Sequence, residues 1–162
     1  MLGFMRRNCL NICDIGAIKS LYNCLVRSLL KYNSVIWCPV YNCHVQRLER
    51  IQNKFVKFLL FKLRFSYRNV PYVTRIQLER IESLQRRRSN ALACFLFRLV
   101  NGQINCDALL SLITFQMPNR LTRSCQLFHS DYHRTIYGSQ RFSSRLMRNY
   151  NVNFEYIDLL LF

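Results

Sequence analysis

Acidic residues are scarce in this chain of 162 residues, and their scarcity argues against several kinds of catalytic site. Eight Asp and Glu stand against 24 Lys and Arg, which gives a net charge of +16. Two-metal phosphoryl transfer needs carboxylates that are close enough to share cations. No two acids are adjacent, and the neighbours Glu79 and Glu82 lie among arginines, where salt bridges are the simpler role. The sequence therefore predicts no catalytic residues of this kind.

Glycine and long apolar runs are also in short supply. The four glycines form neither a Gly-rich phosphate loop nor a Gly-x-Ser-x-Gly nucleophile elbow. No apolar run approaches the roughly 18 residues that a membrane-spanning helix needs. The start "MLGFMRRN" lacks the apolar core and the cleavage site of a secretory signal. We therefore expect no transmembrane segment and an intracellular protein, in the nucleus or the cytoplasm.

Cysteine is abundant, but its spacing does not favour a metal site. Reducing conditions inside the cell argue against disulfides among the eight cysteines. The cluster of Cys38, Cys43 and His44 beside a proline lacks the Cys-x2-Cys spacing of common zinc sites. His129 and His133 lie in a turn-rich segment, which favours hydrogen-bonded histidines over metal ligands. We therefore predict no bound metal and no cofactor.

Apolar periodicity predicts two helices in the first part of the chain. One stripe at three- and four-residue steps runs from Ile18 to Ile36, and it predicts a helix that ends near Pro39. Asn42 then serves as a possible N-cap for a second helix that runs to about Phe61. The inward positions that we expect are Ile18, Leu21, Leu25, Leu29, Tyr32 and Ile36 in the first helix, and Val45, Leu48, Ile51, Phe55, Phe58 and Leu59 in the second.

The second helix also carries a row of cations. Arg47, Arg50, Lys54 and Lys57 follow one another at steps of three, four and three residues, so they align along one side. Helical geometry puts such neighbours about 5 to 6 Å apart, close to the phosphate spacing along one strand. A solvated helix face is the plain alternative to a surface that follows phosphates. The further candidates for contact with nucleic acid are Lys62, Arg64, Arg86, Arg87 and Arg88.

The excess of positive charge favours an anionic partner. Nucleic acid, RNA or DNA bound through its backbone, is the more plausible partner, and an acidic membrane surface is the less plausible one. The run from Arg86 to Arg88 stands in the first turns of a further predicted helix, where cations are unfavourable. An anionic contact or a salt bridge to Glu79 or Glu82 would offset that cost, and both explanations stay open.

The sequence after the second helix predicts further helices that are joined by longer loops. The break "RNVPYV" precedes a short helix over residues 72–81, and Ser83 is a plausible N-cap for a longer helix that ends at Gly102. Residues 117–140 predict loop with one short strand, and a final amphipathic stretch runs from Ser139 to Tyr150. The predicted fold is all-α, with a small helical bundle over residues 1–68 and a helical, loop-rich extension over residues 69–162.

Five blocks of this sequence resemble one family of proteins. The blocks "LGFMRRN", "SLYNCLVRSLLKYNSVIWCPVY" and "RLERIQNKFVKFLLF" are similar to the segment that follows the palm in reverse transcriptases of non-LTR retrotransposons, particularly the insect jockey-like group. The blocks "ESLQRRRSNALACFLFRLVNGQINCDALLSLI" and "HRTIYGSQRFSSRLMRNYN" resemble the C-terminal extension of the same proteins. The similarity runs through nearly the whole chain in the expected order. It implies a thumb, which is a small helical bundle that grips template and primer, followed by a C-terminal region.

The resemblance implies a non-catalytic piece of an RNA-directed DNA polymerase. The paired aspartates of the palm would lie upstream of Met1 and are absent here, so we expect no polymerase activity from this chain alone. In a longer parent protein, a palm and fingers domain would be its partner. The positions that match the first thumb helix and its corner are Tyr22, Leu25, Val26, Ser28, Leu29, Tyr32, Trp37 and Pro39, and those that match the second helix are Leu48, Glu49, Ile51 and Gln52.

Two other interpretations stay open. The first is a basic amphipathic module that binds a partner or lies on an anionic membrane surface. The second is a decayed copy without a selected function. The family has an acid where Gln85 and Arg86 stand here, so the expected capping box of that helix is lost.

Overall fold

The computed structural model describes residues 1–39, 41–63, 71, 74, 81–116 and 126–154. These residues are mainly helical, and the β-type pairing within them is one isolated antiparallel bridge between Phe115 and Phe128. The predicted all-α fold is confirmed. The chain divides into two compact units, Met1–Arg87 and Arg88–Phe162. The boundary predicted at residues 68 and 69 lies outside the described residues, as does the short helix predicted over residues 72–81 except for Thr74 and Ile81.

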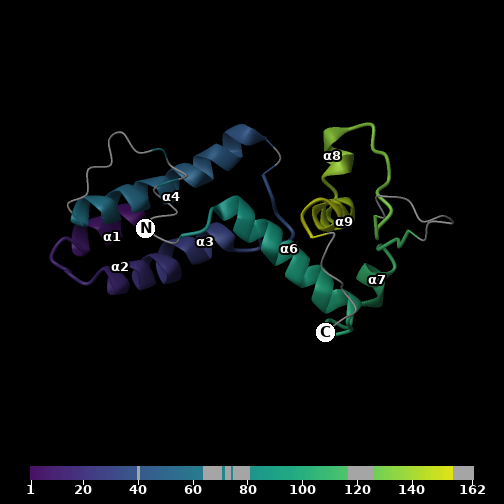
Figure 1. Ribbon diagram of the computed structural model, residues 1–162, viewed down its shortest axis with the longest axis horizontal. Coiled ribbons are helices and arrows are strands. Elements are labelled where there is room, and N and C mark those ends of the chain that lie inside the picture. Colours follow the sequence, from purple (N-terminus) through teal and green to yellow (C-terminus); the bar gives the residue numbers. More distant parts are fainter. Residues whose placement is uncertain (40, 64–70, 72–73, 75–80, 117–125, 155–162) are drawn as a thin grey trace. The chain divides into compact units, whose positions relative to one another are not determined.

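The first unit consists mainly of helices that pack around an apolar core, with a smaller buried cluster of Val56 and Leu60 beside it. Figure 1 shows α1 lying along α4, and α1 also contacts the π-helical segment η1. The elements are α1 (Leu2–Asn8), α2 (Ile15–Leu21), η1 (Tyr22–Arg27), α3 (Ser28–Lys31) and α4 (Asn42–Lys62), together with the first turn of α6 (Leu84–Val100).

The core of this unit centres on a pair of stacked rings. Tyr22 and Phe55 lie with their ring centroids 3.7 Å apart and their planes 4° from parallel. Met5, Ile18 and Leu59 are buried around them. Burial of this apolar area supplies the main stabilisation of the unit, because each large side chain removed from water contributes roughly 1.5–3 kcal/mol.

The apolar stripe predicted for the first helix is displaced after its first turn. Ile18 is buried as expected, but the next buried residues are Tyr22 and Val26, whereas Leu25 and Leu29 are exposed. The cause is η1, in which Ser28 N–H donates to Asn23 O across five residues. A π turn holds more residues than an α turn, so successive steps of four stay on one face.

The end predicted for this helix near Pro39 was wrong, because the helix already ends at Lys31. Asn33 takes a left-handed backbone conformation, with φ of 54°. Asparagine tolerates this region better than most residues. The carbonyl of Asn33 then accepts hydrogen bonds from the N–H groups of Ile36 at 3.1 Å and Trp37 at 2.8 Å, which fixes the corner before α4.

The second helix was predicted well. It runs from Asn42 to Lys62, and the N-cap is Tyr41, one residue earlier than expected. Phe55, Phe58 and Leu59 are buried as predicted. Val45, Leu48 and Ile51 are only partly buried, and the buried set also includes Gln52, Val56 and Leu60.

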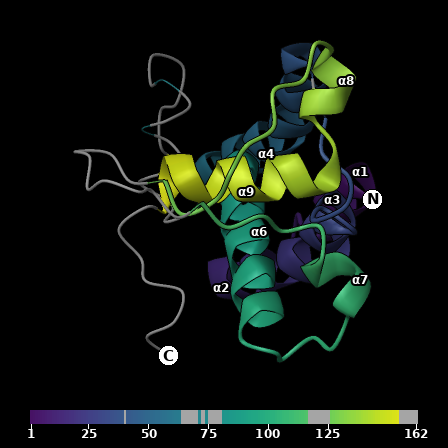
Figure 2. The same cartoon turned by 90° about the vertical axis from the view of Figure 1, so that its right-hand side faces the viewer.

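The second unit contains the rest of α6 with α7 (Asp107–Leu110), α8 (Ile136–Ser139) and α9 (Phe142–Asn153). Figure 2 shows α9 crossing α6. At the crossing Asn149 Oδ1 accepts from Ser89 Oγ at 2.5 Å, and Asn149 Nδ2 donates to Ser89 O at 2.9 Å. Phe95 and Phe142 also meet edge to face, with centroids 5.6 Å apart. Polar and aromatic contacts therefore join the two helices.

The predicted ends of α6 are confirmed. Ser83 Oγ accepts from Arg86 N–H at 3.3 Å, as an N-cap side chain does. The helix ends before Gly102, whose φ of 69° is the left-handed conformation expected there. The predicted final helix is also present, and it spans Phe142–Asn153 instead of residues 139–150.

A second asparagine of α9 holds the loop in front of it. Asn151 Nδ2 donates to Phe128 O at 2.8 Å, and Asn151 Oδ1 accepts from Phe128 N–H at 3.4 Å. The Phe128 ring is fully buried and lies 5.2 Å from the ring of Tyr150 and 5.2 Å from that of Phe115. The Asn151 side chain thus binds both backbone groups of Phe128, as a residue of a neighbouring β-strand would.

None of the helices in the described ranges has both the length and the apolar character that crossing a membrane requires.

Candidate nucleic-acid interface

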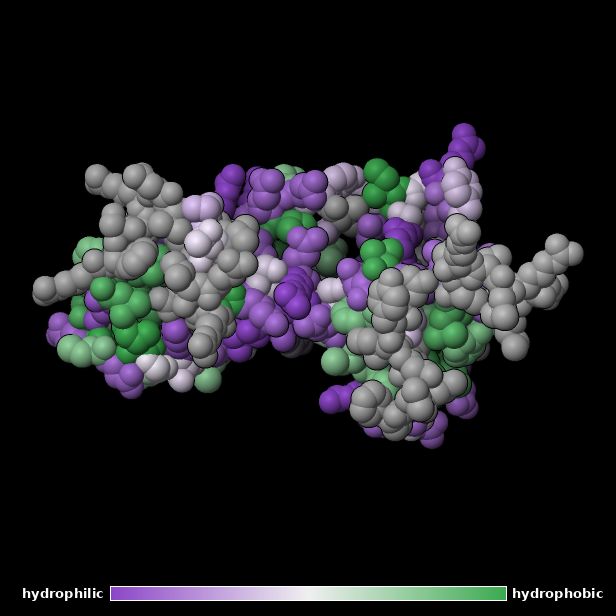
Figure 3. Space-filling view, in the orientation of Figure 1, coloured by the Kyte–Doolittle hydropathy of each residue, from purple (hydrophilic) through white to green (hydrophobic). Residues whose placement is uncertain are grey.

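The four cations predicted as a row lie exposed on α4. Arg47, Arg50, Lys54 and Lys57 are all open to solvent. The opposite side of the helix is buried and carries Gln52, Val56 and Leu59. At 100° per residue these four positions fall within less than a quarter turn of the helix, roughly 80°. We refer to them as the α4 cation row. Figure 3 shows hydrophilic residues, in purple, beside hydrophobic ones, in green, on the first unit.

Glu49, the one acid within α4, is engaged away from this row. Its Oε1 accepts from Gln85 N–H at 3.2 Å, in the first turn of α6. Gln52, one turn further along α4, is fully buried, and its Nε2 donates to Glu82 O at 2.9 Å. The Glu49 carboxylate of α4 therefore places a negative charge at the N-terminus of α6, where such a charge stabilises a helix. Sequence reasoning missed this contact, because it expected the acid within α6 itself.

Lys62 has a different role from the row. Its Nζ donates to Leu10 O at 2.7 Å and to Ile12 O at 2.5 Å, between α1 and α2. A cation that binds two backbone carbonyls stabilises the connection between these helices and leaves less of its charge for a phosphate. The next predicted candidate, Arg64, lies outside the described residues.

The three arginines at the start of α6 do not form one exposed cluster. Arg86 is exposed. Arg87 lies with its Nε 3.8 Å from Glu82 Oε2, which is the ion pair considered as the alternative from the sequence. Arg88 is buried, with 4 % of its surface exposed. Within this run, Arg86 is therefore the residue open to an external anion.

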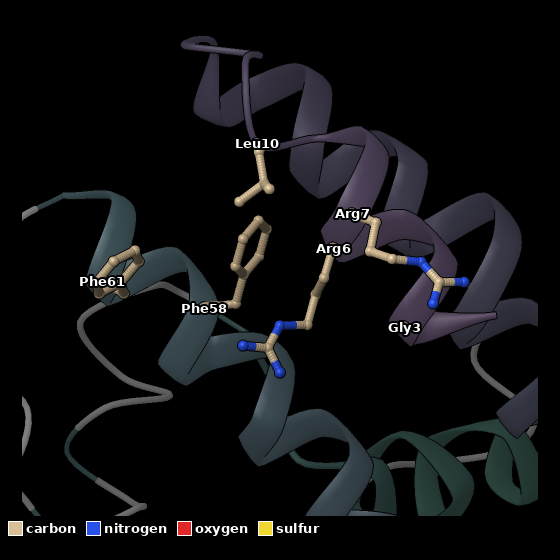
Figure 4. Close-up of a pocket in the computed structure, with 6 residues that line it drawn as sticks. All are labelled: Gly3, Arg6, Arg7, Leu10, Phe58 and Phe61. Atoms are coloured by element: carbon tan, nitrogen blue, oxygen red, sulfur yellow. The ribbon is translucent and has the colours of Figure 1, made fainter.

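A further cation, Arg6, joins the α4 cation row from the neighbouring helix. Its guanidinium carbon lies 5.7 Å from the centroid of the Phe58 ring. Figure 4 shows Arg6 reaching from α1 toward α4, with the Phe58 ring between Arg6 and Leu10, whereas the Arg7 guanidinium points away. No local sequence pattern predicts this arrangement, because Arg6 and α4 are distant in the chain and meet only after folding.

The space between the two helices is hollow. A cavity of about 320 Å³ is lined by Gly3, Arg6, Arg7, Leu10, Phe58 and Phe61. A neighbouring cavity of about 300 Å³ shares Arg6, Phe58 and Phe61 with it and adds Lys54 and Lys57. We call these two cavities together the α1–α4 groove. Their volumes lie at the lower end of the range for small-molecule sites, about 300–1,000 Å³.

A second group of ionisable residues surrounds the buried Tyr22 of the first unit. Burial raises the pKa of the Tyr22 hydroxyl to about 12, while Arg27 opposes this shift and Glu49 adds to it. Burial also lowers the pKa of the Arg27 guanidinium, and the nearby positive charge of Arg87 lowers it further. The three charged residues are only partly buried, and none of them belongs to the α4 cation row.

The residues considered for metal binding have other surroundings. Among the described residues, no three His, Cys, Asp or Glu side chains come together as a possible metal site. His129 Nε2 lies 3.5 Å from Asp131 Oδ1, and His133 Nε2 lies 2.8 Å from Ser144 Oγ, so both histidines have hydrogen-bonding or ionic neighbours. Cys38 and Cys43 are free thiols.

No family model, curated protein or solved structure matches this chain. The candidate interface is therefore defined by its own geometry, with exposed cations on α4, Arg6 on α1 and aromatic side chains between them.

Proposed function

We propose that this chain is a nucleic-acid-binding part of the RNA-directed DNA polymerase of a non-LTR retrotransposon, equivalent to its thumb and the region that follows. In this role it binds RNA or DNA by the backbone and carries out no chemistry. The observation that supports the proposal is the α4 cation row: four exposed positive side chains on one side of a helix whose single acid is bound elsewhere.

The expected binding is electrostatic and tolerant of sequence. Each phosphate that a lysine or arginine neutralises releases counterions, so the affinity falls as the salt concentration rises. Cations spaced along one side of a helix suit the phosphate backbone, and contacts to phosphates carry no information about base sequence. We therefore expect weak binding with little preference for one sequence.

The test measures how the affinity depends on salt. Replacing Arg47, Arg50, Lys54 and Lys57 by Gln should flatten the plot of log affinity against log salt concentration by up to about four units of slope. Two variants with three substitutions each provide the charge-matched comparison: Arg47, Arg50 and Lys54 replaced by Gln, and the exposed Arg98, Arg134 and Arg141 of the second unit replaced by Gln. Fluorescence anisotropy with a labelled oligonucleotide gives both slopes. If the row variant keeps the slope of the unchanged protein, the proposed interface is wrong.

The proposal also includes a palm and fingers domain as partner in a longer parent protein. The genomic sequence just upstream of the Met1 codon tests this part. An open reading frame that encodes a palm with paired aspartates is the expected result. Stop codons between such a palm and Met1 would instead indicate a decayed copy.

A second candidate function is an interaction surface for a protein or an anionic membrane. The exposure of Leu25 at 39 %, Leu29 at 61 % and Tyr32 at 77 % favours it, because these side chains face solvent along η1 and α3 and at the residue that follows α3. Co-sedimentation with anionic vesicles, in competition with an oligonucleotide, separates the two candidates. Binding to vesicles that the oligonucleotide does not displace would favour the second.

A further inference from the structure

The α1–α4 groove collects positive charge from two helices. Arg6 lines both of its cavities, and Lys54 and Lys57 line the second. Among the residues that the structure describes, none that lines either cavity is acidic. Three cations that line one hollow, with no acidic side chain in its described lining, repel one another, and an anionic ligand relieves that repulsion. The charge of the groove therefore specifies an anion.

The same groove exposes an aromatic ring beside these cations. Phe61 is 66 % exposed, although it lies one turn from Phe58, which is buried. Phe58 already holds the Arg6 guanidinium at cation–π distance. A flat aromatic ligand that stacked on Phe61 would cover the exposed ring and lie close to the Arg6 guanidinium. An inorganic anion would compensate the positive charge of the groove, but it would leave the Phe61 ring exposed to water.

We propose that the α1–α4 groove binds an unpaired nucleotide of a single-stranded nucleic acid, with its base against Phe61 and its phosphate at Arg6 and Lys54. This inference rests on the proposed function and adds a preference for strand state. In a duplex the faces of the bases are stacked on one another, so Phe61 cannot reach them. In a single strand they are free, and stacking on an aromatic side chain is tolerant of base identity.

The test compares one oligonucleotide sequence as a single strand and as a blunt-ended duplex. The Phe61→Ala variant of the full chain should bind the single strand about tenfold more weakly and the duplex less than twofold more weakly. Phe61→Trp should keep the affinity for the single strand, because the indole also stacks. The matched control is Phe4→Ala, since Phe4 is a 58 % exposed phenylalanine of α1 that lines neither cavity of the groove.

The outcomes separate this inference from the proposed function. Phe61→Ala removes no charge, so the salt dependence should stay unchanged while the single-strand affinity falls. If Phe61→Ala lowers the affinity for the single strand and the duplex equally, or lowers neither, the groove does not bind an unpaired nucleotide. The α4 cation row is not affected by that result, because its test is the salt dependence. If Phe61→Ala instead weakens binding only to phosphatidylserine vesicles, the groove serves a lipid surface and the inference is also wrong.

Discussion

In the first unit, large apolar side chains from several helical stretches meet around the stacked rings of Tyr22 and Phe55, and the charged groups lie mostly outside. In the second unit, two asparagines of α9 hold the surrounding backbone, Asn149 at Ser89 and Asn151 at Phe128. An apolar core that loses part of its side-chain volume is destabilised in proportion to that loss. A buried side-chain amide whose oxygen and nitrogen are both hydrogen-bonded specifies one geometry, and it is destabilising when only one of the two bonds is made. The two units should therefore respond to different substitutions.

The largest effect is expected from removing the stacked ring of the first unit. Phe55 is fully buried, so Phe55→Ala should lower the free energy of unfolding of this unit by about 3–5 kcal/mol through lost transfer energy and a new cavity. Hydrogen exchange read by mass spectrometry should show faster exchange in α1 and α4 and little change in α9. The control Phe61→Ala removes an exposed ring of the same helix. Equal acceleration in both units would show that they unfold as one.

The next effect concerns the Tyr22 hydroxyl. Because burial raises its pKa to about 12, the folded state keeps a proton that the unfolded state releases near pH 10. The stabilisation is complete below pH 10 and is lost as the pH rises to 12, a total of roughly 3 kcal/mol. Urea unfolding at several pH values measures this decline.

Tyr22→Phe provides the control for that titration. It removes the ionisable group, so the difference between the variant and the unchanged protein isolates Tyr22 from the other tyrosines. Within the part of the chain that the structure describes, the hydroxyl is buried and makes no hydrogen bond, so at neutral pH the variant should be as stable or slightly more stable. A steep loss of stability above pH 10 that persists in the variant would assign it to another group.

Much of the fold follows from local patterns. The extent of α4, the Ser83 cap, the left-handed Gly102 and the exposed α4 cation row depend on periodicity or on residue type at one position. The left-handed Asn33 is also a local feature, but a proline six residues later was the more familiar stop signal and led to the wrong helix end.

The contacts that escaped prediction join residues distant in sequence. Glu49 caps α6 across 36 residues, and Asn151 binds Phe128 across 23. Arg6 approaches α4 only because α1 packs on it. The π segment escaped for another reason, since the apolar residues after Ile18 fit an α-helical stripe equally well, and packing around Tyr22 decides between the two registers. Tertiary packing therefore determines the groove, while local sequence determines the row.

A smaller effect is expected from the polar contact of the second unit. Asn151→Ala removes both hydrogen bonds to Phe128 and leaves its backbone groups without that partner, at a cost of about 2 kcal/mol. The amide of Phe128 should exchange faster, whereas α1 and α4 should keep their protection. The control is Asn153→Ala, whose side-chain bonds to Asn149 are exposed. If the two variants behave alike, the buried amide has no special role.

The smallest effect separates a structural cation from an interface cation within one helix. Lys62→Met removes the two bonds to Leu10 O and Ile12 O and should lower the free energy of unfolding of the first unit by about 1 kcal/mol. Its effect on the salt dependence of nucleic-acid binding should be slight. Lys57→Met, at an exposed position of the row, should do the reverse, with stability kept and the slope reduced by about one unit. Chemical denaturation and anisotropy on the same two proteins measure both quantities. If Lys62→Met reduces the slope as much as Lys57→Met does, Lys62 also contacts nucleic acid, and its hydrogen bonds to the two carbonyls do not prevent that contact.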